Sequence, residues 1–445
     1  MLPVLAGLGV PAGAQTPLDL PAAMARARGQ ARDVTAAEAR QEAAEARQRQ
    51  ARGWRFPQIR LSETWIRTDS PAEAFALQLN QERFDFGDFV QGDPNDPDPL
   101  DTAISRIELE IPLFTGGELS TRVEQAGRAA EAAGSETSRA GDVAALAAAE
   151  AWIGLAQARE YAELLGRSRE AVAAHVEQAR AFSAQGMLVR SELLRAEVEL
   201  ARMDDLVTEA EGNVRLAEAA LAFRLGEPDA GGYVLTAIPS PAPLGDALAP
   251  WLDTAEERPD LVAARHKLAA GELEAEALRG GLWPRIGVVA RQDWSDDRLF
   301  GTHGDSTSIY AAASFDLFDG GRRRAAIAAA LAEAEAGRQD VAQVVDGIRL
   351  EIRQAWESAR VALERRTTAA RALESAAEAL RITEERFEAG VVRTLDVLDA
   401  ATALREAETR ELVARADAQL AALRLATAAG RRPESVLSSD PIPNP

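Results

Sequence analysis

The sequence predicts a mainly helical protein that carries two β-hairpins and is built as an internal duplication. The first observation is a repeated motif, because Leu113-Phe114-Thr115-Gly116-Gly117 recurs as Leu317-Phe318-Asp319-Gly320-Gly321, 204 positions later (320 − 116). The second is a long proline-free helical pattern over residues 117–182, which has a counterpart over 321–387. The third is a change from helical to alternating apolar periodicity after Pro57 and again after Pro284. The expected class is therefore mainly α with two inserted hairpins.

The duplication keeps its register through the helices. At the same shift Gly186 corresponds to Gly390 and Gly226 to Gly430, so no net insertion separates the two copies in this stretch. A long helical hairpin loses its side-chain register when its length changes, which explains the fixed spacing.

Alanine with interleaved Glu and Arg at helical spacing predicts the helices. The predicted helices are 18–53, 117–182 and 191–225 in the first copy and 260–278, 321–387 and 394–429 in the second. Residues 117–182 alone would extend about 100 Å at 1.5 Å per residue. A helix of that length packs along a partner, so we expect coiled-coil contacts.

Alternating apolar residues predict the strands. Ile59, Leu61 and Trp65 share one face, and the second copy repeats this pattern after Pro284 and again near Ile309. Strands of about 10 residues with one apolar face suit a membrane barrel with a wet interior. A soluble hairpin that packs on the helices is the alternative. In a membrane, four strands leave an open edge, so chains must associate; two chains give eight strands and three give twelve.

Composition excludes several functions. The net charge of −21 argues against nucleic-acid binding. There is no Cys, and His175, His266 and His303 are the only histidines, without metal-ligand spacing. We find no catalytic constellation and no phosphate-binding loop, so neither an enzyme nor a cofactor or metal is expected. Residues 1–14 suggest a remnant of a signal peptide, with Ala12-Gly13-Ala14 as the cleavage site but without a basic start.

At this point the chain resembles the TolC-like outer membrane efflux protein family, the outer membrane factors of tripartite efflux and type I secretion systems. The resemblance covers Leu18 to Arg432 and rests on the doubled glycine motif, on Pro57 and Pro284, and on two similar tip segments. These tips are 182–194 and 386–400.

The resemblance implies a homotrimer that shares a 12-stranded outer-membrane β-barrel, continued by a 12-helix α-barrel across the periplasm of a Gram-negative bacterium. It implies a passive exit duct for small molecules or proteins, powered by an inner-membrane pump through a periplasmic adaptor (membrane fusion) protein. The only other implied partner is outer-membrane lipid. The competing interpretation is a soluble, elongated coiled-coil scaffold protein.

The expected organisation has two repeats joined by a linker. The first repeat is 15–226, with an outer loop at 68–103 and a helical tip near 183–191. The linker follows at 227–259. The second repeat is 260–430, with a tip near 388–394, and the tail is 431–445. The outer loop either covers the pore or is an inert, disordered tip.

The two tips hold the candidate site residues. Gly186 and Gly390 suit positive φ at the turns, and Ser191 and Thr394 suit the N-caps of the return helices. These structural roles alone could account for the residues.

The resemblance implies more for the acidic residues at the tips. Asp396 and Asp399 lie on one helical face and would ring the periplasmic entrance, six carboxylates in a trimer. Arg393 would bridge to Glu192 and hold the entrance closed. The apolar tip residues suggest an adaptor-docking surface, made of Gly186, Met187, Leu188, Ser191, Gly390, Val391, Val392 and Thr394.

Overall fold

The computed structural model describes residues 17–187, 189–242, 245, 247–389 and 391–437. The chain divides into two compact units, and each draws on both repeats of the sequence. The sheet unit contains 41–133 and 264–341, and the hairpin unit contains 1–40, 134–263 and 342–445. The two longest helices, α5 (Glu118–Ala184) and α9 (Arg322–Glu388), contribute residues to both units.

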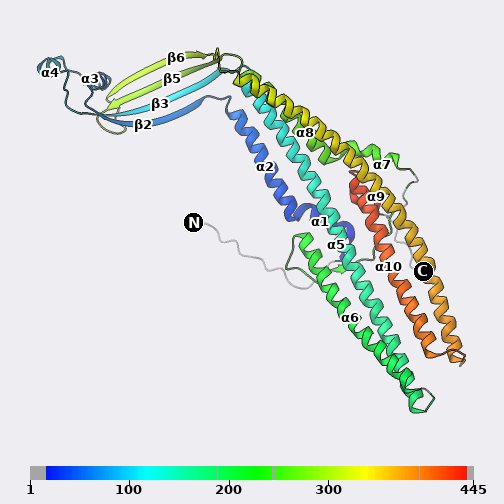
Figure 1. Ribbon diagram of the computed structural model, residues 1–445. Coiled ribbons are helices and arrows are strands. Elements are labelled where there is room, and N and C mark those ends of the chain that lie inside the picture. The colour runs from blue at the N-terminus through cyan, green and yellow to red at the C-terminus, as the bar shows by residue number, and fades with distance from the viewer. Residues whose placement is uncertain (1–16, 188, 243–244, 246, 390, 438–445) are drawn as a thin grey trace. The chain divides into compact units, whose positions relative to one another are not determined.

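The sheet unit holds one antiparallel sheet of four strands in the order β2-β3-β5-β6 (Figure 1). Its strands are β2 (Gln58–Thr68), β3 (Leu100–Phe114), β5 (Arg285–Asp296) and β6 (Gly304–Ser314). The two predicted hairpins are thus confirmed, and they join through the β3–β5 pairing. Strands β2 and β6 each have a partner on one side only, so the sheet has two open edges within the chain.

The two faces of the sheet differ in polarity. Large apolar side chains on one face are exposed, with Ile59 at 76%, Leu61 at 65% and Ile309 at 73%. On the other face, the Arg106 guanidinium donates to both Asp293 carboxylate oxygens, at 2.7 and 3.0 Å. This is the alternation that the sequence predicts for strands between an apolar and a wet environment.

Helix α8 (Pro259–Gly280) packs beside both long helices within the sheet unit. Glu274 pairs with Arg122 of α5, and Glu272 pairs with Arg338 of α9 at 2.8 Å. Helix α2 (Arg32–Gly53) packs against α5, where Gln48 approaches Gly127 closely. The helices therefore follow the same order as the strands, α2-α5-α8-α9.

The long loop between β2 and β3 is folded and contains two helices that the sequence did not predict, α3 (Pro71–Asn80) and α4 (Phe86–Gln91). Gln81 is only 1% exposed, and its amide donates to the Asp101 carbonyl at 3.1 Å and the Thr102 hydroxyl at 2.7 Å. Arg83 pairs with Asp296 at the end of β5. Polar contacts to β3 and β5 therefore anchor the loop, whereas its covering of a pore stays a prediction.

The hairpin unit contains α1 (Leu20–Gln30), α6 (Arg190–Leu225) and α10 (Thr394–Ala428) with the distal parts of α5 and α9. The predicted single helix over 18–53 is wrong, because the chain breaks at Ala31, where ψ is 139°. The break allows the Gln30 carbonyl to approach Gly226, at which a Cβ would lie 2.8 Å from that oxygen. The helix break at Ala31 therefore goes with a contact to Gly226, a residue distant in sequence.

The predicted linker also contains structure. Its short strand β4 (Val234–Leu235) pairs in parallel with β1 (Pro17–Leu18), and the Leu18 carbonyl accepts from the buried Trp152 indole at 2.8 Å. Two short helices follow, α7 (Ala249–Asp253) and the 3₁₀ helix η1 (Thr254–Glu257). A further 3₁₀ helix, η2 (Pro433–Val436), contacts α10. The described part of the tail is thus held against the end of the long hairpin.

Candidate functional site

The turn between α5 and α6 is a glycine-dependent helix end. Gly186 has φ of 73°, which confirms the positive φ predicted for this glycine. Its N–H donates to the Ser183 carbonyl at 3.0 Å, and the Met187 N–H donates to the Phe182 carbonyl at 3.0 Å, which closes the last turn of α5. The corresponding Gly390, as well as Leu188, lies outside the described residues.

The predicted N-caps of the return helices are wrong. Helix α6 is capped by Val189, and Ser191 is its second residue; α10 is capped by Arg393, and Thr394 is its first residue. The Asp396 carboxylate accepts a bond of 2.9 Å from the backbone N–H of Arg393. A carboxylate three residues into the helix thus satisfies the cap N–H, so α10 begins without a hydroxyl at the cap.

The acidic tip residues differ in their surroundings. Asp396 lies 3.9 Å from the Arg393 guanidinium; the Arg393 side chain is largely exposed, whereas that of Asp396 is partly buried. Within the described residues, Asp399 makes no side-chain hydrogen bond or ion pair, and Arg393 does not pair with Glu192. Asp399 therefore has fewer local side-chain contacts than Asp396. Roles in a gate or in selectivity stay predictions for Asp396, Asp399, Arg393 and Glu192.

Apolar side chains are exposed at both tips. Met187 is 63% exposed and Val391 is 73% exposed, while Val392 is half-buried. Beyond the predicted residues, Val189 at 68%, just before α6, and Val198 at 70%, within α6, are also exposed. The sequence analysis did not single out either valine. A water-exposed apolar surface of this kind is typical of a docking site.

The Arg393–Asp396 bond gives a prediction for local stability. Asp396→Ala should destabilise the first turn of α10 by about 1 kcal/mol, because it removes the acceptor at the helix start. Asp399→Ala should change that turn by less than about 0.5 kcal/mol. Amide hydrogen exchange over the first turn of α10 measures both effects. Equal exchange in the two variants would contradict a capping role for Asp396.

A buried arginine that the sequence did not reveal joins four segments of the hairpin unit. Arg258 is 2% exposed and follows η1. Its guanidinium donates to Asp260 at 3.0 and 2.6 Å, to Glu351 of α9 at 2.7 Å and to the Ala428 carbonyl at the end of α10 at 2.6 Å. The tripeptide Arg258-Pro259-Asp260 at a helix start is the only sequence signal for this arrangement.

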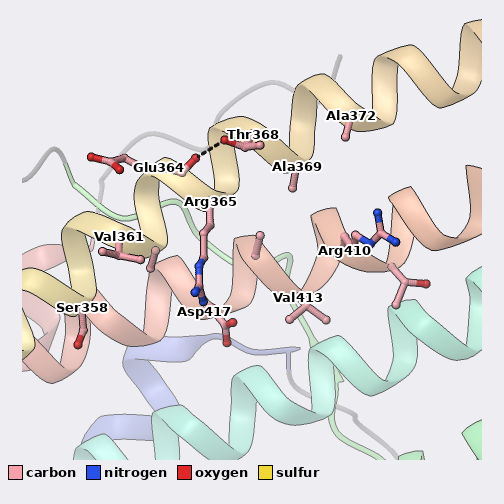
Figure 2. Close-up of a pocket in the computed structure, with 13 residues that line it drawn as sticks. Ser358, Val361, Glu364, Arg365, Thr368, Ala369, Ala372, Arg410, Val413 and Asp417 are labelled. Atoms are coloured by element: carbon pink, nitrogen blue, oxygen red, sulfur yellow. Dashed lines mark hydrogen bonds between the residues drawn. The ribbon is translucent and has the colours of Figure 1, made fainter.

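An open groove of about 790 Å³ lies between α9 and α10 in the hairpin unit. Figure 2 shows Arg365 of α9 pointing toward Asp417 of α10, with alanines along the groove. The Thr368 hydroxyl donates to the Glu364 carbonyl within α9 at 3.0 Å and so is used locally. The lining combines small apolar side chains with single charges and contains no pair of acid and base in contact. It offers contact surface but no catalytic arrangement.

The described residues contain no cluster of His, Cys, Asp or Glu that could hold a metal ion. Among the same residues, none of the helices is long and apolar enough to cross a bilayer.

Comparison with known proteins gives consistent matches. The family model described as outer membrane efflux protein matches residues 23–227 and 252–431. The outer membrane protein OprJ of Pseudomonas aeruginosa is 33% identical over 245 residues, which are 52% of this chain and 49% of OprJ. The outer membrane efflux protein BepC of Brucella suis is 28% identical over 291 residues, 64% of this chain and 62% of BepC. The aligned parts thus span only about half to three-fifths of these relatives.

Solved structures extend the likeness of fold to nearly the whole chain. The crystal structure of a membrane protein from Pseudomonas aeruginosa has a TM-score of 0.78 at 21% identity, and the match covers 92% of this chain and 93% of that one. At this identity the likeness concerns the fold.

Proposed function

The chain belongs to the outer membrane efflux protein family, which locates it in the outer membrane and the adjoining periplasm, and we propose that it forms the exit duct of an export system. Three copies would share a 12-stranded β-barrel and a 12-helix α-barrel. The duct is passive, carries out no enzymatic reaction and needs no cofactor. An inner-membrane pump drives small molecules or proteins through it by way of a periplasmic adaptor protein.

The observation that carries this proposal is the four-stranded sheet with two open edges and one exposed apolar face. An apolar face can lie in contact with lipid, but unpaired backbone N–H and C=O groups at the sheet edges cost free energy there because lipid offers them no hydrogen-bond partner. Closure with strands from other copies removes both edges. Three copies give twelve strands, enough to leave a water-filled lumen.

The accessible surface of a single chain also supports association. The chain exposes 26924 Å². A folded monomer of 47.5 kDa ordinarily exposes about 16,000 Å². The excess includes Leu350, 55% exposed, and Val361, 38% exposed, on α9. Contact with neighbouring copies would bury part of this excess.

In the trimer, the polar face of the sheet would line the barrel. On that face Arg291 contacts Glu108 at 3.3 Å and the Tyr310 hydroxyl at 3.1 Å, and Arg60 approaches Glu108 at 3.7 Å. These ion pairs suit a wet lumen and would be costly against lipid.

The helical tips would form the periplasmic entrance. Threefold symmetry brings together six carboxylates from Asp396 and Asp399, whose field attracts cations and repels anions. A second contact, between Arg393 and Glu192, would form only when the tips of the complete trimer close.

The exposed apolar residues at the tips would receive the adaptor. The exposure of Met187 and Val391 supports a docking surface, which we propose to comprise Gly186, Met187, Leu188, Ser191, Gly390, Val391, Val392 and Thr394. In this proposal the residues 227–259 form a belt around the tunnel, between the repeats 15–226 and 260–430.

Conductance across planar bilayers tests the proposal. The purified protein should form pores, and the double variant Asp396→Asn/Asp399→Asn should lower the ratio of cation to anion permeability about fivefold, which corresponds to about 1 kcal/mol of lost attraction. Reversal potentials in a salt gradient measure this ratio. As a control, Glu38→Gln/Glu42→Gln removes two exposed carboxylates from α2 and should leave the ratio unchanged.

The results separate the alternatives. An unchanged ratio with normal pores would contradict the gate, and the absence of pores would contradict the duct. Full solubility without detergent would favour the elongated coiled-coil scaffold instead.

A further inference from the structure

A groove of about 340 Å³ lies between the end of α2 and the start of α5, within the sheet unit. One helical stripe at the end of α2 forms one wall, and the first two turns of α5 form the other. The side chains that line the groove are Arg47, Gln50, Ala51, Trp54, Leu119 and Arg122. The lining thus combines two guanidinium groups and an amide with an indole ring and aliphatic side chains.

The Arg47 guanidinium has no protein partner within the described ranges, where it makes neither a side-chain hydrogen bond nor an ion pair. Arg122, in contrast, donates to the Gln125 side-chain carbonyl at 3.0 Å and pairs with Glu274 of α8. The charge of Arg122 is therefore balanced within the protein, whereas Arg47 leaves a positive charge in the groove for an anionic ligand.

The sequence around the groove is basic although the chain as a whole is acidic. From Ala46 to Ser62 there are five arginines and no Asp or Glu, in a chain with a net charge of −21. On the other wall, the Glu118 carboxylate next to the groove pairs with Arg285 at 2.7 Å. The local field therefore attracts an anion to this place.

The groove lies at the end of the sheet from which the long helices continue. Trp54 is four residues before β2 (58 − 54), and Leu119 is five residues after β3 (119 − 114). At the same end of the sheet, Phe56 is 66% exposed and Trp283 is 62% exposed. Exposed aromatic side chains form girdles where a membrane barrel meets the headgroup region. In a sheet that spans the outer membrane, the groove is thus at the depth of the headgroups of the periplasmic leaflet.

The second repeat has different side chains at the equivalent positions. Helices α5 and α9 are related by a shift of 204 (322 − 118), and α2 and α8 by a shift of 227 (259 − 32). By the second shift, Arg47 corresponds to Glu274 and Trp54 corresponds to Gly281. The helix packing that the two repeats share therefore requires neither the cation nor the indole.

We propose that the groove binds the headgroup of an anionic phospholipid in the periplasmic leaflet of the outer membrane. The Arg47 guanidinium would donate to the lipid phosphate, and the Gln50 amide would bond to oxygen atoms of the phosphate or the glycerol. Trp54 and Leu119 would contact the glycerol and the first part of the acyl chains. The site rests on the proposed barrel, since it needs the sheet to span the membrane, but not on what the duct carries.

Titration of the delipidated protein in detergent with phosphatidylglycerol tests the site, and native mass spectrometry measures the bound lipid. The affinity should be at least fivefold higher than for phosphatidylcholine, whose headgroup has no net charge. Arg47→Gln should lower the affinity for phosphatidylglycerol about fivefold, the factor that corresponds to about 1 kcal/mol for one arginine at a lipid headgroup. It should change the affinity for phosphatidylcholine less than twofold. Arg47→Lys keeps the charge and should retain most of the affinity.

Arg49→Gln is the matched control. Arg49 is also exposed near the end of α2, but it does not line the groove. Its replacement removes the same charge and should lower the affinity for phosphatidylglycerol less than twofold. An equal loss in Arg47→Gln and Arg49→Gln would show that a diffuse positive field holds the lipid, and would overturn the proposed site.

Two further measurements separate the lipid from free phosphate and the site from the duct. An excess of inorganic phosphate should not displace phosphatidylglycerol, because it lacks the contacts to Trp54 and Leu119. Displacement would assign the groove to a soluble anion and overturn the lipid. Arg47→Gln should form pores of native conductance in planar bilayers. Native pores in a protein without preference for phosphatidylglycerol would overturn the site and leave the duct, whereas a preference without pores would overturn the duct alone.

Discussion

Replacement of Arg258 by Met should destabilise the hairpin unit by about 3 to 5 kcal/mol, the usual cost when one partner is removed from a buried ion pair. The change removes the donor of the Ala428 carbonyl and two of the hydrogen bonds to the Asp260 carboxylate, which keeps the Leu261 N–H and the more distant Arg139. It also removes the ion pair between Arg258, which follows η1, and Glu351 of α9. Because Glu351 is half exposed, this ion pair contributes less to stability than the buried contacts do. Thermal unfolding of the detergent-solubilised protein, followed by helical circular dichroism, measures the loss.

Two comparisons make this result specific. Arg360→Met removes an arginine of α9 whose side chain and acidic partners Glu357 and Glu364 are all exposed, so it should cost less than about 0.5 kcal/mol. Arg258→Lys retains the charge but not the planar fork that holds Asp260 through two bonds, and it should recover less than half of the loss. Equal stability of Arg258→Met and Arg360→Met would contradict a structural role for Arg258.

The same contact predicts how stability depends on pH. Burial raises the pKa of Asp260, but the hydrogen bonds and charge of Arg258 outweigh burial and hold that pKa below its ordinary value. A carboxyl whose folded pKa is depressed contributes stability above its unfolded pKa and loses it as pH falls through the folded value. The difference in stability between the native protein and Arg258→Met should therefore shrink in acid, below about pH 4.

The sequence predicted the elements whose signals are local and repeated. Prolines at 57 and 284 mark the strand entries, and uninterrupted helical periodicity predicted α5 and α9 nearly to the residue. For the helices that follow the double glycines, the duplication predicted equal lengths in the two repeats, because a common register allows no insertion. The family, the location in the outer membrane and the mainly helical class were all predicted from these signals.

What the sequence did not predict depends on contacts between distant residues. The break at Ala31 reflects the approach of Gly226, and the ion pairs of Arg258 require the end of α10 to lie beside η1. The N-caps at Ser191 and Thr394 were wrong because hydroxyl residues near a turn suit several positions, and the observed helix starts lie one or two residues earlier. Residue type alone does not decide among such neighbouring positions.

A paired substitution of glycines should separate folding of one chain from assembly of several. Gly116→Ala and Gly320→Ala place a Cβ on backbones with φ of 64° and 70°, so both carry a similar conformational cost of about 1 to 2 kcal/mol. At Gly116 the new methyl would also lie 2.2 Å from the Gly280 carbonyl oxygen and 2.8 Å from the Trp283 Cβ. This overpacking adds about 1 to 3 kcal/mol. Gly116→Ala should therefore prevent the two repeats from joining, and little folded protomer should be recovered.

Gly320→Ala should behave differently, because no atom of its own chain lies within 4 Å of the added Cβ. Its protomer should fold, and the overpacking should appear only when a neighbouring copy closes the edge at which Gly320 lies. After refolding into detergent, limited proteolysis measures the folded protomer and native mass spectrometry measures the trimer. We expect near-native protection but at least a tenfold loss of trimer. Native trimer yield in Gly320→Ala would show that this glycine has no close neighbour in the assembly.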